Sequence, residues 1–259
     1  MNLDGVKTYG RLALRLLGLG AVMGGVLALG LLGWQWQTTV QMEEVSVTGA
    51  RHAPADTVRS LARVEPGVVM ENIDAAMVED RVTRHPWIER AEVTKQRSRR
   101  TVLIEVSERA PAALVVDGRG TPAFYLDQNG YAMPLPDSTG YDVPLVRGLD
   151  ATYHPVRQIA PPSLRGLLST LPTSVADPLV AEVAVQPDSS IRLITAPIGD
   201  YGSIPVRLGD GDYSGKLRQL RAFAEQVLLP PTPSTDSTIA EIDLRFDGQI
   251  VTRTTPRDG

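Results

Sequence analysis

The segment of this 259-residue chain that most resembles a chemical site is Gly209 to Lys216, Gly-Asp-Gly-Asp-Tyr-Ser-Gly-Lys. Phosphate-binding loops of related spacing cradle phosphate with glycine amides and hold magnesium with a final Ser or Thr hydroxyl. Here Asp210 stands where the first glycine is required, and Leu217 replaces the hydroxyl. Two aspartates would repel phosphate, and a calcium loop of the EF-hand type would need a later bidentate glutamate. We therefore predict a turn that leads into a helix near Ser214.

No other combination of residues predicts catalysis, metal binding or a cofactor. The chain has no cysteine, which excludes thiol chemistry and cysteine-bound metals. The histidines His52, His85 and His154 are isolated and match no metal-ligand spacing. The motifs G-x-S-x-G and H-E-x-x-H are absent. The residues alone therefore nominate no catalytic site.

The first structural element that the sequence predicts is a membrane helix. Residues Leu16 to Trp34 carry no charge and, at about 1.5 Å per helical residue, reach roughly 28 Å, close to the thickness of a bilayer core. Lys7, Arg11 and Arg15 precede this stretch, so the positive-inside rule places the N-terminus in the cytoplasm. A cleaved signal peptide is the alternative, but the stretch is long, and Trp34-Gln-Trp36 follows in place of a small-x-small cleavage site.

Small residues recur at every fourth position of this span, at Gly20, Gly24 and Ala28. Such spacing allows another helix to pack closely. Glycine is also common in membrane helices generally, so both interpretations stay open.

The chain after about Val40 is then extracytoplasmic and long enough for two domains. The net charge of −4 and this topology both argue against a nucleic-acid partner.

The first part of this region predicts a small α+β domain with the order strand, helix, helix, strand, strand. The first strand ends at Gly49, the second helix should be capped by Asn72, and Pro86 should end it. The apolar residues expected on one face of the sheet are Val45, Val47, Val93, Val102, Ile104 and Val106. A basic connector, which includes Arg97, Arg99 and Arg100, is either a solvated hairpin tip or a docking site for anionic lipid or an acidic partner.

From Pro111 onward the pattern is β-rich, with two helices. Hairpins are predicted around Asn129-Gly130 and between 180–185 and 191–195. Of the helices at 163–171 and 214–228, the second should bury one face and expose the other. The residues expected on its buried face are Leu217, Leu220, Ala224 and Val227, and those expected to point away are Lys216, Arg218 and Arg221.

The chain should end in a hairpin of strands 239–246 and 249–254, joined at Asp247-Gly248 after a low-complexity bridge at 231–237. Ala240, Ile242, Leu244 and Phe246 alternate with charged residues in the first strand, as inward residues do. For Phe246 the core and the partner-binding surface are both open. The later strand should lie at an open sheet edge, where a partner chain could add a strand.

Four segments of the chain, together with the anchor, resemble the FtsQ/DivIB family of bacterial division proteins. They are Val45 to Gly49, Pro86 to Val93, Val102 to Ala112 and Ile242 to Phe246. The resemblance implies an α+β chain with a cytoplasmic tail (1–15), a transmembrane helix (16–36), a POTRA domain (42–110), a β-rich domain with two helices (111–254) and a short tail (255–259). It also implies a non-enzymatic divisome scaffold in the inner membrane at the division septum, with periplasmic domains.

The resemblance further implies that FtsB- and FtsL-type partners bind here and help to control septal peptidoglycan synthesis. In the family, the last strands form the main FtsB site, and the matching residues here are Arg245, Phe246, Gly248 and Arg253. The neighbouring Ile250 and Val251 join this candidate site, and Arg97, Arg99 and Arg100 form a possible secondary contact. Arg253 departs from the aromatic residue of proteobacterial relatives, and the turn is one residue shorter.

Two other classes of function are compatible with the residues. One is a POTRA-type binding module of an envelope export or assembly system, although such proteins usually carry several repeats. The other is an anchored envelope enzyme with an unrecognised site.

Overall fold

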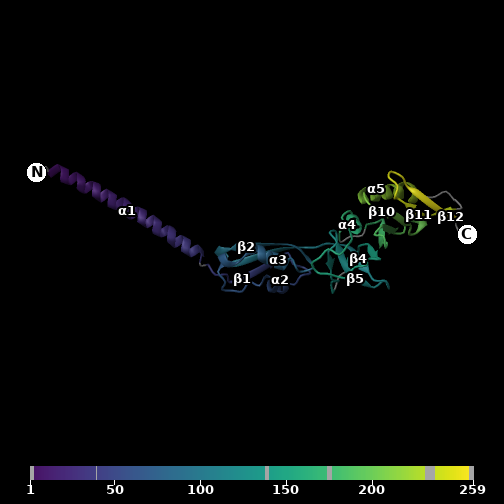
Figure 1. Cartoon of the computed structure of the whole chain (residues 1–259), viewed down its shortest axis with the longest axis horizontal. Coiled ribbons are helices and arrows are strands. Elements are labelled where there is room, and N and C mark those ends of the chain that lie inside the picture. Colours follow the sequence, from purple (N-terminus) through teal and green to yellow (C-terminus); the bar gives the residue numbers. More distant parts are fainter. Residues whose placement is uncertain (1–2, 39, 138–139, 174–176, 231–236, 257–259) are drawn as a thin grey trace. The chain divides into compact units, whose positions relative to one another are not determined.

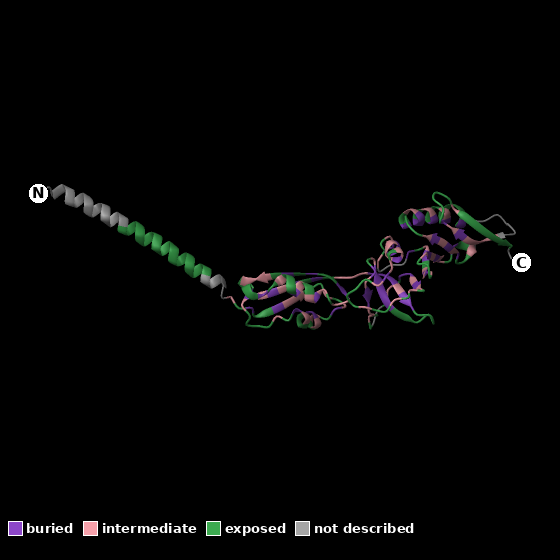
Figure 2. Cartoon of the chain, viewed as in Figure 1, coloured by how far each residue is buried: buried purple, intermediate pink, exposed green. Residues whose placement is uncertain are grey.

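The computed structural model describes residues 3–38, 40–137, 140–173, 177–230 and 237–256 (Figure 1). Helix α1 (Leu3–Thr38) contains the apolar window Leu17–Trp34, whose mean hydropathy is 1.9 and none of which is buried against the chain (Figure 2). This helix is long and apolar enough to cross a membrane. Most of the low-complexity bridge, 231–236, and the last residues of the predicted tail, 257–259, lie outside the described residues.

The predicted α+β order of the first domain is confirmed. Its elements are β1 (Glu44–Thr48), α2 (Ala55–Ala62), η1 (Met70–Asn72), α3 (Ala75–Val82), β2 (Ile88–Gln96), η2 (Arg97–Arg99) and β3 (Thr101–Glu108). The strand order is β1-β3-β2, and β1 runs parallel to β3 with Val45 opposite Val102 and Val47 opposite Ile104. A parallel pair needs a crossover connection, which the helices supply. Five of the six residues predicted for one face are buried, and the sixth, Val47, is half-buried.

The predicted cap of the second helix is wrong. Asn72 ends the short helix η1, and α3 begins later, where the Asp74 carboxylate accepts a hydrogen bond from the Met77 amide at 3.1 Å. An aspartate three residues before the bonded amide is a standard N-cap arrangement. Because α3 turns Val78 and Val82 inward, Met77 is 49% exposed.

By compactness the chain divides into two units, one of residues 1–48, 55–81 and 91–105 and the other of residues 49–54, 82–90 and 106–259. The second unit therefore includes some residues of the first domain. It contains a carboxylate held by a loop: Glu108 Oε1 accepts the amides of Arg51, His52 and Ala53 at 2.7 to 2.9 Å, and Glu108 Oε2 lies 2.7 Å from His52 Nδ1. The His52 ring stacks on Trp87 with a centroid distance of 4.4 Å. Burial alone would raise the pKa of Glu108, but the hydrogen bonds from Ala53, Arg51 and His52 together hold it below the ordinary value.

A nine-stranded sheet forms the β-rich part, in the order β12-β11-β10-β9-β8-β7-β4-β5-β6. The strands are β4 (Pro111–Val116), β5 (Pro122–Asp127), β6 (Ala132–Met133), β7 (Leu145–Arg147), β8 (Val180–Val185), β9 (Ile191–Thr195), β10 (Pro205–Gly209), β11 (Ser237–Asp243) and β12 (Val251–Pro256). The helices are α4 (Pro162–Leu168), η3 (Gly199–Tyr201), α5 (Tyr213–Phe223) and the π-helical η4 (Ala224–Leu228). Both predicted internal hairpins are confirmed, as β5-β6 and β8-β9.

Helices α4 and α5 supply Leu164, Leu167 and Leu220 to the core that buries one face of this sheet. Two expectations for the second helix are wrong. Lys216 is buried, because its ammonium donates to the carbonyls of Leu208 and Asp210 at 2.9 and 2.6 Å. Val227 is 43% exposed, because the π turn shifts the phase of the helix and buries Leu228 in its place.

The Gly209 to Lys216 loop is the predicted structural turn. Gly209 and Gly211 have φ of +64° and +70°, a conformation that favours glycine. Asp212 caps α5 by accepting a hydrogen bond from the Gly215 amide at 3.0 Å. Asp212 and Lys216 therefore hold this loop together.

Candidate partner-binding site at the sheet edge

The last strand, β12, lies at an edge of the nine-stranded sheet, as the sequence predicts. It pairs antiparallel with β11, with Asp243 opposite Val251 and Glu241 opposite Arg253. Every residue of β12 is exposed (Figure 2), and within the described residues no strand lies on its other side. The outward backbone groups of β12 can therefore pair with an added strand.

The opposite edge of the sheet offers no comparable surface. Strand β6 has two residues, Ala132 and Met133, and both are buried. Pro134 and Pro136 follow directly, and proline has no amide to donate to a neighbouring strand. Of the two edge strands of this sheet, β12 is therefore the one open to strand addition.

The predicted limits of the final strands are shifted in the structure. Strand β11 ends at Asp243 and β12 begins at Val251, so a longer segment, 244–250, joins them. Leu244 continues beside β10, since its amide donates to the Arg207 carbonyl at 2.9 Å. The Asp-Gly turn is present: the Gln249 amide donates to the Phe246 carbonyl at 3.2 Å, and Gly248 has φ of +67°.

A β-bulge interrupts the predicted inward alternation of β11. Ile239 lies opposite Thr254 but Glu241 lies opposite Arg253, so Ala240 is the extra residue. Ile239 consequently packs against the core, and Ile242 is fully buried. The expected inward alternation therefore fails at Ala240. Of the two placements left open for Phe246, the structure shows the exposed one.

The candidate residues of the final hairpin differ in how they are placed. Phe246 is 51% exposed in the turn, and Val251 is 46% exposed at the start of β12. Ile250 is half-buried and packs partly against the core. Arg245 and Arg253 carry their charges on the solvent face, where they pair with Asp243 at 2.6 Å and with Glu241 at 3.2 Å.

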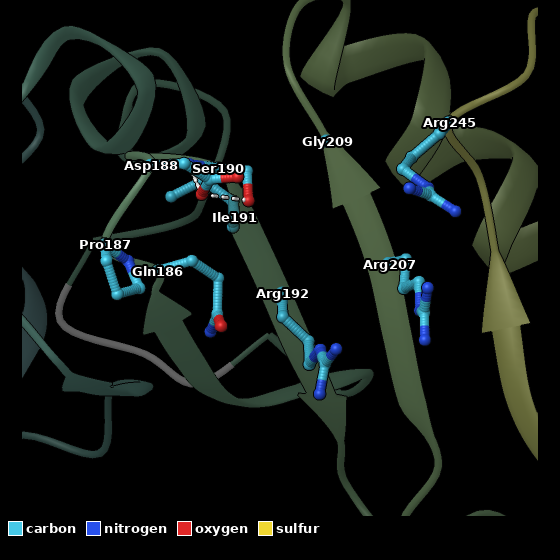
Figure 3. A pocket seen from close by; sticks show the side chains of 9 residues that line it. All are labelled: Gln186, Pro187, Asp188, Ser190, Ile191, Arg192, Arg207, Gly209 and Arg245. Atoms are coloured by element: carbon cyan, nitrogen blue, oxygen red, sulfur yellow. Dashed lines mark hydrogen bonds between the residues drawn. The ribbon is translucent and has the colours of Figure 1, made fainter.

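Beside this edge lies an arginine hollow of about 410 Å³, which the sequence alone did not reveal (Figure 3). Arg192 of β9 stands directly opposite Arg207 of β10, and Arg245 approaches from the segment after β11. Like charges placed opposite each other on a sheet are unfavourable without a counter-charge. Besides these three arginines, the hollow is lined by one carboxylate, Asp188, and it is open to solvent.

Besides Asp188, two carboxylates beside the hollow form ion pairs with two of its three arginines. Glu241 accepts from Arg207 at 2.6 Å, and this hydrogen bond holds the pKa of Glu241 below its ordinary value. The hydrogen bond from Arg245 likewise lowers the pKa of Asp243. Among the described residues, no carboxylate forms an ion pair with Arg192. An acidic side chain of a partner would complete this arrangement.

The basic connector of the first domain is largely compensated by its own domain. The Lys95 ammonium donates to the carbonyls of Met70 and Ile73 at 3.1 and 2.9 Å. Arg97 pairs with Glu71, and Arg100 pairs with Glu43. These contacts favour the solvated hairpin tip over a docking site for an acidic partner.

Comparison with known proteins agrees with the family resemblance of the sequence. Residues 40–109 match the family described as POTRA domain, FtsQ-type, and residues 110–253 match FtsQ/DivIB, C-terminal related. The chain is similar to a protein of Salinibacter ruber, with 53% identity over the full length of both chains. It is also similar to a protein of Rhodothermus marinus, with 40% identity over 88% of this chain and 83% of the relative. Both relatives are named Cell division protein FtsQ.

Proposed function

The chain belongs to the FtsQ/DivIB family of cell division proteins, and we propose that it is a non-enzymatic scaffold of the divisome that docks FtsB- and FtsL-type partners. The docking site is the edge strand β12, together with the segment that joins it to β11. Through these partners the chain would help to control septal peptidoglycan synthesis.

The open edge of β12 is the observation that carries this proposal. A partner segment that pairs with β12 gains backbone hydrogen bonds, each worth about 0.5 to 1.5 kcal/mol net. Backbone pairing gives affinity without sequence preference, so side chains must choose the partner. Phe246 and Val251 offer exposed apolar contact, and the arginine hollow favours an acidic residue.

The membrane arrangement follows from α1, which makes the chain a single-pass membrane protein. Lys7, Arg11 and Arg15 precede the apolar window, which supports a cytoplasmic N-terminus and periplasmic domains. Membership of the cell division family supports a place at the septum of the inner membrane. The apolar helix and the two family matches, at 40–109 and 110–253, support the division into tail, anchor, POTRA domain and β domain given above.

Site-specific photocrosslinking tests the proposed docking site. A photoreactive amino acid at Thr254 should crosslink to the FtsB-type protein of the same organism, because Thr254 is exposed on β12. The control position is Arg119, which is also exposed and lies in the turn between β4 and β5. Crosslinks from Arg119 but not from Thr254 would move the docking site away from β12.

A further inference from the structure

A second hollow lies at the same end of the sheet as the arginine hollow. Its volume is about 600 Å³. We call it the Gly148 hollow, and its lining residues outside the β8-β9 turn are Gly148, Leu149, Asp150, Ile159, Pro161 and Val185. Gln186 and Pro187 line both hollows, so the β8-β9 turn is a ridge with one hollow on each side. Figure 3 shows these two residues across the arginine hollow from Arg245.

The Gly148 hollow is formed by residues that are held in place. Leu149 and Ile159 are half-buried and pack partly against the core, so each also leaves apolar surface open. Gly148 has φ of +73°, and a Cβ there would lie 2.4 Å from the Val185 carbonyl, so no side chain can fill this point. The Ser163 hydroxyl of α4 donates a hydrogen bond to the Ser189 carbonyl of the β8-β9 turn at 2.7 Å and so holds the turn in place.

We propose that the Gly148 hollow is a second anchor for the partner that adds a strand to β12, and that it receives an apolar side chain from the segment flanking that strand. This inference rests on the proposed function. A continuous path supports it: the exposed Phe246 turn adjoins the start of β12, Arg245 of the arginine hollow comes next, and the shared ridge leads to the Gly148 hollow.

The strand order sets the length that the partner segment needs. Five strand spacings separate β12 from β7, at whose end Gly148 lies, and at about 4.8 Å each they amount to roughly 24 Å. About seven extended residues or about sixteen helical residues cover that distance. The partner segment should therefore combine a strand, an acidic residue for the arginines and an apolar residue of leucine size farther along.

Blocking the hollow with a bulky thiol label tests this inference. The natural chain has no cysteine, so Asp150→Cys carries a single reactive thiol at an exposed position of the hollow. Gln226→Cys on η4 is the control, since it is exposed and lines neither hollow. The full-length chain, in detergent, is titrated with the FtsB-type protein of the same organism in two lengths: the strand-forming segment alone and the complete extracytoplasmic region.

The labelled Asp150→Cys variant should bind the long partner about ten-fold more weakly, as expected for losing part of the burial of one leucine-sized side chain. Its binding of the short segment should stay unchanged, and the labelled control should bind both as the unlabelled chain does. Equal affinity of the two lengths for the unlabelled chain, or no effect of the Asp150 label, would overturn the second anchor and leave β12 docking intact. Failure of the unlabelled chain to bind either length would instead overturn the proposed function.

Discussion

Proline at one of two neighbouring positions of β12 should separate partner docking from folding. Amide directions alternate along a strand, so of Val251 and Thr252 one donates toward β11 and the other toward the open edge. Proline at the inward position removes a hydrogen bond between β11 and β12, whereas proline at the outward position removes only a donor for the partner. Both side chains are exposed, so neither substitution empties the core.

The size of the effect follows from the length of β12. About half of its six residues direct an amide and a carbonyl outward, so a docked strand forms on the order of six backbone hydrogen bonds. The outward proline removes one of them and leaves a partner carbonyl unpaired, which costs about 1 to 3 kcal/mol. We expect affinity to fall about ten-fold or more while the free energy of unfolding changes by less than about 1 kcal/mol.

The assay compares Val251→Pro and Thr252→Pro in the full chain, measuring capture of the FtsB-type protein and thermal unfolding of each variant. The matched controls are Val251→Ala and Thr252→Ala, which keep both amides. If both proline variants stay folded and bind as tightly as their alanine controls, strand addition at β12 is the wrong mechanism.

Three further predictions concern stability. Ile104→Ala should lower the free energy of unfolding by about 2 to 4 kcal/mol, because Ile104 is fully buried; an unchanged urea midpoint relative to the half-buried Leu103→Ala control would contradict the core assignment. The folded-state pKa of Glu108 is lowered from 4.5. The ionised carboxylate therefore stabilises the fold at pH values above 4.5, and this stabilisation is lost as the pH falls through the folded-state pKa. Glu108→Gln should therefore destabilise the chain more at pH 7 than at about pH 3 in denaturant titrations. Lys216→Met should lower the melting temperature and cost about 1 to 3 kcal/mol, because two loop carbonyls lose their donor; an unchanged melting temperature would refute that role.

Elements that depend on local sequence were predicted well. The Asn129-Gly130 and Asp247-Gly248 turns are set by residues a few positions apart, and the structure contains both. The cap of α3 was misplaced because Asn72 and Asp74 are both good capping residues, and only the path of η1 decides between them.

Features that depend on strand neighbours could not be read from the chain. Arg192 and Arg207 each fit the polar face of a strand, but their juxtaposition requires knowing that β9 pairs with β10 in that register. The bulge at Ala240 depends in the same way on the pairing with β12. Lys216 looked like a solvent-facing residue of an amphipathic helix, and its burial depends on the β10 loop that curls over it.

The unequal edges of the nine-stranded sheet also limit how copies of this chain can combine. Head-to-tail growth into a fibre would need two different open edges, and the short, proline-flanked β6 removes one of them. Two copies could still pair β12 with β12, a closed two-fold arrangement that stops at the dimer. Such a dimer would occupy the edge that the partner requires, so self-association through β12 and partner docking would be mutually exclusive, and a high local concentration of the chain would compete with assembly.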